Sequence, residues 1–266
     1  MFTLAIAVTP DAVKAIKSEL TSTLPHVKSS HRCEAIARGL GFRTYASARV
    51  AALSATSDRT VVCGERFVAY LAEHHFTASA EPFYRAAAKV ALCDIAKTNP
   101  KLTMWGIGIG RPQRKSDGKW EDSRDRYAKF VEARKELVSD GAVGAFLASL
   151  AFIARVTRTK TIRQGTGSYR LKHIAENFAC TYPEGNKLGP RYVPNGVLIA
   201  AAIHAGFQYR SYFDELGYDD LNVSFNMSKP CIDDLDCEIR SNGAHAQSRK
   251  YRAETRRYRS SLGTAV

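Results

Sequence analysis

An acid-free stretch of basic residues is the feature of this sequence that most directly suggests chemistry. Residues 155–172 contain six Lys or Arg side chains, interleaved with threonines and glycines. Such side chains contact phosphate oxygens, and an aromatic ring among them stacks on an unpaired base. The alternatives are a solvated linker or a surface that faces the acidic residues 214–238. The residues expected to contact nucleic acid here are Arg155, Arg158, Lys160, Arg163 and Tyr169.

Residues 30–53 have the outline of a helix-turn-helix, because a glycine-containing turn separates two helical patterns. Such a unit places its second helix in the major groove of DNA. Arg43, Thr44 and Arg49 would then contact base edges or phosphates. Tyr45 and Leu53 would hold the second helix in place. The alternative is an ordinary α-hairpin with solvated arginines.

Residues 239–266 form a basic tail with SRKYRAETRRYRS at its centre. Arg256, Arg257 and Arg259 are its candidate contacts, and Arg252, Arg256 and Arg259 are spaced to share a helical face. The tail lacks the large apolar residues of a membrane-lying helix, so we expect it to contact DNA or RNA before an acidic lipid surface. The alternative is a frayed terminus that folds back on its acidic neighbour.

No motif in the sequence indicates an enzyme. The glycines at 106–110 precede an Arg-Pro pair, which does not open a helix on a phosphate, and neither a phosphate-binding loop nor a nucleophile elbow is present. His173 and Glu176 are interpreted as a surface hydrogen bond, and His204 as a satisfied core residue. We expect no catalytic residue, metal or cofactor. One set of possible ligands matches no strong zinc signature: Cys231, Cys237 and His245.

The hydrophobic pattern predicts an α-rich α+β fold to carry these segments. Alternation predicts strands at 2–8 and 102–110, the second packed closely by another element, and a half-buried β-hairpin over 207–228. Helical spacing predicts helices near 10–23, 30–39, 45–54, 64–73, 81–97, 125–139, 142–155, 168–181 and 195–206. The polar loop suggests a helical N-terminal domain at 1–110, a linker at 111–124 and a C-terminal domain at 125–238, before the tail.

The overall composition favours a polyanionic partner. The chain has 39 Lys and Arg against 26 Asp and Glu, which gives a net charge of +13. Its apolar segments are too short to predict a membrane span. The six cysteines are scattered and form no Cys-x-x-Cys pair, so we expect reduced thiols and a cytoplasmic location.

Three segments carry a resemblance: KSSHRCEAIARGLGFRTYASARVAAL, SYRLKHIAENF and YVPNGVLIAAAIHAGF. They resemble segments of uncharacterised bacterial proteins borne by plasmids and integrative elements, which implies a mobile-element context and no particular reaction. With the charge, this favours a nucleic-acid-binding accessory protein of plasmid maintenance, transfer or regulation that prefers DNA over RNA. The alternatives are a non-enzymatic factor that inhibits or tethers an acidic partner protein, and an enzyme without a readable motif.

Overall fold

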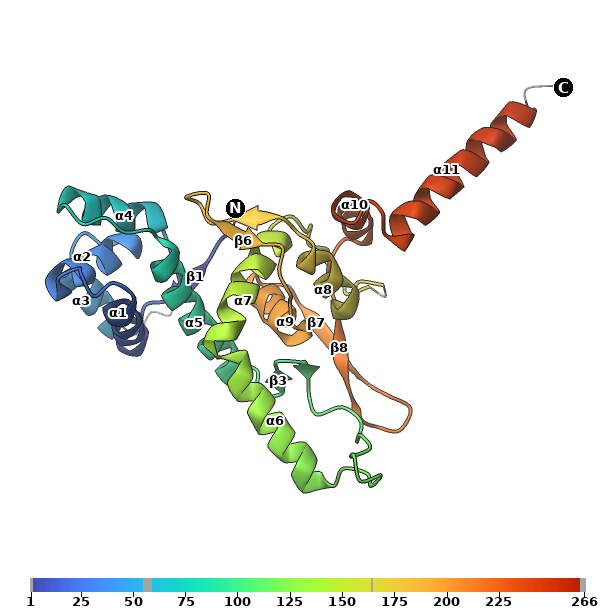
Figure 1. Ribbon diagram of the computed structural model, residues 1–266, viewed down its shortest axis with the longest axis horizontal. Coiled ribbons are helices and arrows are strands. Elements are labelled where there is room, and N and C mark those ends of the chain that lie inside the picture. The colour runs from blue at the N-terminus through green and yellow to red at the C-terminus, as the bar shows by residue number, and fades with distance from the viewer. Residues whose placement is uncertain (1, 55–58, 164, 264–266) are drawn as a thin grey trace.

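The structure is a computed structural model that describes residues 2–54, 59–163 and 165–263, with side chains described up to residue 255. Within these residues the chain forms eleven helices and eight short strands (Figure 1). Every strand belongs to a two-stranded pair, and each pair is antiparallel, so the predicted α-rich α+β fold is confirmed. In chain order the elements are β1 (Ala5–Ala7), α1 (Pro10–Thr23), α2 (Ser29–Gly39), α3 (Tyr45–Leu53), β2 (Arg59–Val61), α4 (Gly64–Glu73), α5 (Glu81–Thr98), β3 (Leu102–Thr103), β4 (Gly106–Ile107), α6 (Ser123–Leu137), α7 (Asp140–Ile153), α8 (Ser168–Glu176), β5 (Cys180–Thr181), β6 (Lys187–Gly189), α9 (Asn195–His204), β7 (Tyr209–Phe213), β8 (Asp219–Phe225), α10 (Lys229–Ile239) and α11 (Ala244–Gly263).

Helices α1 to α4 form one end of the molecule (Figure 1). The sequence signals at the start of α1 act as expected. The hydroxyl of Thr9 accepts a hydrogen bond from the Ala12 N–H at 3.1 Å, and Pro10 occupies the first turn. β1 and β2 pair so that Ala5 lies opposite Val61, which ties the start of the chain to the connection between α3 and α4.

The centre of the core lies between α5, α7 and α9, which contact one another. All residues of α7 from Ala142 to Ile153 are buried, as expected of a helix that is apolar on all sides. The one polar residue of this buried stretch, Ser149, is satisfied because its hydroxyl donates to the Ala145 carbonyl at 2.7 Å. No single described helix is long and apolar enough to cross a membrane, and α6 and α7 pass that test only as a pair bent by 65°.

Residues 102–110 form a tight hairpin, so the prediction of a single strand is wrong. The chain reverses between β3 and β4, where Gly106 has a φ angle of 145°, which glycine adopts without strain. Gly108 and Gly110 follow β4 with φ angles of 84° and 71°. The predicted close packing is confirmed. A Cβ atom at Gly106 would overlap the backbone of Leu221 on β8, and one at Gly108 would overlap Asp219.

The C-terminal half contains the predicted β-hairpin, in which Tyr209 of β7 lies opposite Phe225 of β8. In contrast, α8 ends at Glu176 and does not continue to residue 181. The side chain of Asn177 donates to the His173 carbonyl at 2.8 Å, which replaces the continuing helix with a local hydrogen bond. The chain then enters the β5–β6 pair.

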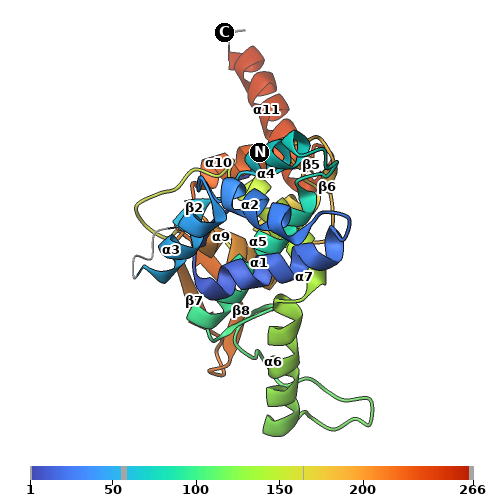
Figure 2. The same cartoon turned by 90° about the vertical axis from the view of Figure 1, so that its left-hand side faces the viewer.

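The polar loop at 111–124 lies beside α6, which extends from the body in both views (Figures 1 and 2). Residues before and after this loop contribute to one continuous core, which includes Phe83 and Phe146. The division into domains at this loop stays a prediction. At the other side, α11 leaves the body beyond α10 and projects away from it in both views (Figures 1 and 2).

Candidate nucleic-acid interface

Local hydrogen bonds fix the turn between α2 and α3. Gly41 has a φ angle of 83°, a conformation that favours glycine. Thr44 caps α3, because its hydroxyl accepts from the Ser47 N–H at 3.1 Å while the Ser47 hydroxyl accepts from the Thr44 N–H at 3.1 Å. Glu34 of α2 accepts from the Tyr45 N–H at 2.9 Å, which ties the start of α3 to α2.

The face of α3 that contacts the body is smaller than expected. The buried residues of the helix are Ala48 and Ala52, whereas Val50 and Leu53 are 71% and 76% exposed. The prediction that Leu53 holds the helix in place is wrong, because one residue advances about 100° around a helix and carries position 53 off the face that Ala52 occupies. A helix-turn-helix that reads DNA stays a prediction. Its predicted contacts all lie at the surface: Arg43, Thr44 and Arg49.

A groove of about 270 Å³ runs between α1 and α3. Apolar groups including Val13 and Leu53 line part of it, and three basic side chains complete it: Lys14, Lys17 and Arg49. The surface that α1 and α3 form together is therefore apolar as well as basic.

The basic stretch 155–172 is partly neutralised by the fold. Arg155 forms two hydrogen bonds to the Glu238 carboxylate, at 2.7 and 2.9 Å. Arg158 donates to the Ala205 carbonyl at 2.6 Å. Two further predicted contacts are exposed and have no ion pair within the part of the chain that the structure describes: Lys160 and Arg163.

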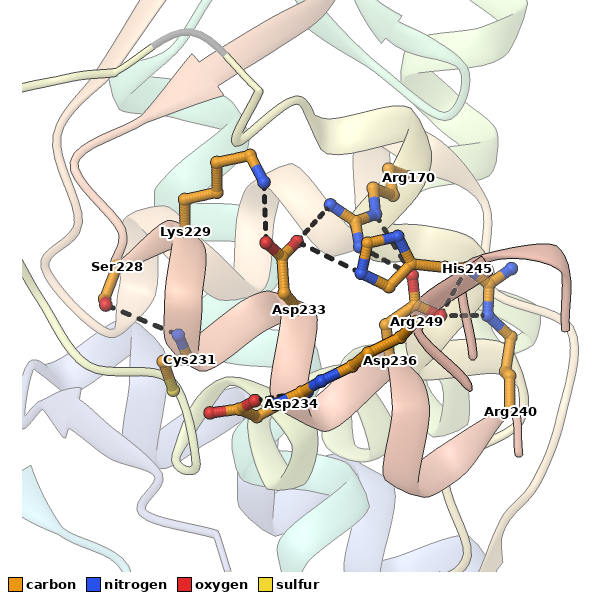
Figure 3. A network of polar contacts seen from close by, with 10 residues as sticks. All are labelled: Arg170, Ser228, Lys229, Cys231, Asp233, Asp234, Asp236, Arg240, His245 and Arg249. Atoms are coloured by element: carbon orange, nitrogen blue, oxygen red, sulfur yellow. Dashed lines mark hydrogen bonds and ion pairs between the residues drawn. The ribbon is translucent and has the colours of Figure 1, made fainter. Parts of the chain in front are cut away.

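Arg170 joins α8 to α10 through two carboxylates (Figure 3). Its guanidinium donates to Asp233 at 2.7 Å and to Asp236, a 2% exposed residue, at 2.7 and 3.1 Å. Burial raises the pKa of Asp233, but hydrogen bonds from Lys229 and Arg170 outweigh it and hold the pKa below its usual value. This part of the stretch therefore faces the acidic segment and serves to attach α10.

A second cluster lies on the same helix. The Lys172 ammonium pairs with Glu176 at 2.9 Å, and Nδ1 of His173 lies 2.8 Å from the other oxygen of that carboxylate. The ammonium also lies over two tyrosine rings, 5.8 Å from the centroid of Tyr169 and 4.8 Å from that of Tyr192. Tyr192 is not among the residues predicted from the sequence, because its position beside Lys172 arises from tertiary packing of the segment between β6 and α9.

α11 carries the basic tail on a helix that projects from the body (Figure 1). Ala246 is buried near its start, and Arg249 donates to Asp234 of α10 at 2.6 Å. The next three side chains are exposed: Lys250, Tyr251 and Arg252. The predicted contacts Arg256, Arg257 and Arg259 belong to α11, but their side chains lie outside the described residues.

The three basic segments do not form one continuous surface. α3 and α11 lie at opposite ends of the longest axis, with α8 between them (Figure 1). In Figure 2, which looks onto the α1–α4 end, α11 rises beyond the body and away from α3. A nucleic acid on α11 would therefore not reach α3 without spanning the molecule.

Both histidines that were candidates for acid–base catalysis, His173 and His204, have structural partners. His173 contacts Glu176 as described, and Nε2 of His204 accepts a hydrogen bond from the Ala5 N–H at 3.3 Å. Burial, aided by the positive charge of Arg59, lowers the pKa of His204 to about 4, so its imidazole is neutral at pH 7. His204 thus ties β1 to α9, as expected of a satisfied core residue.

The described residues contain cavities but neither a metal-binding cluster nor a disulfide. No group of three His, Cys, Asp or Glu side chains there lies close enough to hold a metal ion. A cavity of about 430 Å³ between the β3–β4 hairpin and α6 has mixed lining, with Trp105 beside Arg126 and Glu132. All six cysteines are free thiols, as predicted, and Cys33 is the buried one.

No protein-family model, no curated protein and no solved structure matches this chain. Its function therefore has to be inferred from the charges, contacts and exposed side chains described above. Two arrangements are candidates for ligand contacts: the basic helix α11, and the aromatic cluster of Tyr169 on α8 and Tyr192 before α9.

Proposed function

We propose that this protein binds nucleic acid, DNA in preference to RNA, through phosphate contacts made by α11. The observation that carries the proposal is the position of α11, a basic helix that projects from the body beyond α10 (Figure 1). From Lys250 onward the sequence has five Lys or Arg residues and one acid, Glu254. Such a helix attracts the phosphate backbone of any sequence and releases counterions on binding.

The carboxylates of α10 are already engaged by basic side chains, which supports this proposal. Four basic residues occupy the carboxylates of α10 that face the body: Glu238 pairs with Arg155, Asp233 and Asp236 with Arg170, Asp236 with Arg240, and Asp233 with Lys229. Asp234 takes Arg249 from the first turns of α11. These pairs satisfy the α10 carboxylates that would otherwise neutralise the tail, so the exposed Lys250 and Arg252 remain available to a partner.

The biological setting follows from the resemblance of three segments to proteins of plasmids and integrative elements. A cytoplasmic accessory protein of plasmid maintenance, transfer or regulation would act on DNA in this setting. Phosphate contacts carry no sequence information, so any sequence preference would come from the separate α2–α3 unit.

The test is a salt titration of binding to a fluorescent DNA duplex. The slope of log K against log salt changes by about 0.9 for each phosphate contact. We expect a chain that ends at Arg249 to lose most of its affinity and several units of this slope. The matched control is Arg43→Ala with Arg49→Ala, which should keep the slope within about two units of the full chain. Absence of binding by the full chain at low salt would overturn the proposal.

A second candidate function is binding of an acidic protein, and the groove between α1 and α3 favours it. Its exposed apolar residue Leu53 and its basic residues Lys14, Lys17 and Arg49 match the two faces of an acidic amphipathic helix. Leu53→Asp should abolish capture of such a helix and leave DNA binding unchanged. Loss of DNA binding in Leu53→Asp would instead assign this surface to nucleic acid.

A further inference from the structure

Two exposed tyrosine rings on the molecule share one buried cation. Tyr169 and Tyr192 are 58% and 63% exposed, whereas Lys172, whose ammonium lies over both rings, is 7% exposed. Tyr169 lies in the first turn of α8, and Tyr192 precedes α9. Tertiary folding thus gathers the two rings around a single charge.

Contacts on its inner side hold this cluster in place. Glu176 binds the Lys172 ammonium at 2.9 Å and accepts from the Val193 N–H at 3.4 Å, next to Tyr192. Burial raises the pKa of Glu176, but hydrogen bonds from Lys172 and His173 outweigh it and keep the carboxylate charged. The ring of Tyr169 meets that of His173 edge to face, with centroids 4.6 Å apart. The exposed rings are therefore fixed before any ligand arrives.

Fixed and exposed aromatic rings beside basic residues are suited to one kind of ligand. Bases stack on aromatic rings when they are unpaired, whereas the bases of a duplex already stack on one another. Preorganised rings also lose little conformational entropy when a ligand binds. The acid-free stretch that contains Tyr169 also contains the exposed Lys160 and Arg163, whose charges add to the attraction of the protein for a phosphate backbone.

We propose that Tyr169 and Tyr192 form a stacking site for unpaired nucleobases. The chain then holds single-stranded segments more tightly than α11 alone would. This inference rests on the proposed nucleic-acid function and adds to it the structure of the nucleic acid that is recognised. An unpaired base occurs in single-stranded DNA and in single-stranded RNA, so both are tested.

The experiment measures binding of the full chain to three labelled 20-mers by fluorescence anisotropy: a DNA strand, an RNA strand of the same sequence and the DNA duplex. We expect Tyr169→Ala and Tyr192→Ala each to weaken single-strand binding by about tenfold, because stacking contributes about 1–3 kcal/mol per base and 1.4 kcal/mol is tenfold. Duplex affinity should stay unchanged. Tyr169→Phe and Tyr192→Phe keep the ring and should keep the affinity.

The matched control is Tyr127→Ala, which removes a tyrosine of similar exposure, 62%, on α6. It should leave every affinity unchanged, and thermal unfolding should show that all variants fold. Loss of affinity for one kind of strand alone would support the site and show that the sugar contributes. Equal affinity of the tyrosine-to-alanine variants and the parent for both strands, with duplex binding intact, would overturn this inference and leave the proposed function standing. No binding of any of the three probes would overturn both.

Discussion

Residues 155–172 and helix α11 are two basic regions with similar composition and different surroundings. In the first, Arg155, Arg170 and Lys172 each pair with a carboxylate of α10 or α8. In the second, Arg249 pairs with Asp234, and the exposed Lys250 and Arg252 have no ion pair within residues 2–255 outside the gaps at 55–58 and 164. A local count of charges in a sequence therefore does not give the potential of a surface.

The difference separates charges that stabilise the fold from charges that are free to bind. A cation held by a buried carboxylate contributes to stability, because removing it leaves an uncompensated charge. A cation in water contributes little to stability and keeps its attraction for phosphate. Variants of the paired charges and variants of the unpaired charges should therefore change different measurements.

The largest effect is expected from reversing charge on α11. Lys250→Glu with Arg252→Glu should weaken duplex binding on the order of a hundredfold at low salt, because phosphate contacts dominate affinity there. Unfolding by urea should hardly change, since both side chains are exposed. The control is Arg155→Gln, which should leave the affinity within about twofold. A comparable loss of affinity in this control would remove the distinction between the two regions.

Acid should lower stability through His204 before it affects either basic region. The pKa of this imidazole is about 4 in the folded chain and 6.5 as the ordinary value, so the unfolded chain takes up the proton first as pH falls. The contribution of neutral His204 to the free energy of unfolding is complete above pH 6.5 and decreases toward pH 4, by about 3 kcal/mol in total.

Urea unfolding at several pH values tests this expectation. His204→Gln keeps a hydrogen-bond acceptor but does not titrate, so it should flatten the decline between pH 6.5 and 4. Lys and Arg side chains of α11 stay charged throughout this range, so the tail should still bind DNA wherever the protein is folded. A decline of the same size in His204→Gln would assign the acid sensitivity to other groups.

The attachment of α10 should depend on Arg170. Arg170→Met leaves the buried Asp236 with Arg240 as its remaining partner, so we expect a loss of about 2 kcal/mol in the free energy of unfolding. Lys229→Met removes a more exposed partner of Asp233 and should cost less. Binding of DNA by the folded Arg170→Met protein should be unchanged. No loss of stability would show that the network in Figure 3 does not hold α10 in place.

Local signals predicted many of the elements, because they act over a few residues. The cap at Thr9 with Pro10 set the start of α1, and the alternation of Leu221 to Met227 predicted the β-hairpin. The same alternation failed at residues 102–110, where the chain reverses before Gly106, a glycine at positive φ. Alternation reports which faces are apolar and does not report where the chain turns.

The parts of the candidate site that the sequence did not predict depend on contacts between residues far apart in the chain. The sequence left open whether residues 155–172 contact nucleic acid or face the acidic residues 214–238. The contacts of Arg155 with Glu238 and of Arg170 with Asp236 decide this for part of the stretch. The sequence also drew attention to Tyr169 but not to Tyr192, which lies 23 positions further along the chain. Leu53 is exposed because the rest of the fold covers another face of α3, and the sequence of α3 alone does not show which face that is.

The smallest effect is expected for the pair of Arg155 with Glu238. Its side chains are 39% and 57% exposed, so water screens the attraction and a double-mutant cycle with Arg155→Gln and Glu238→Gln should give a coupling below about 1 kcal/mol. The hydrogen bond from Arg155 holds the pKa of Glu238 below its ordinary 4.5. The coupling should therefore be complete above pH 4.5 and disappear as pH falls through the lower, folded value. A coupling of several kcal/mol would show that this exposed pair stabilises the fold as strongly as the buried contacts of Arg170. Exposure would then not separate charges that stabilise the fold from charges that are free to bind.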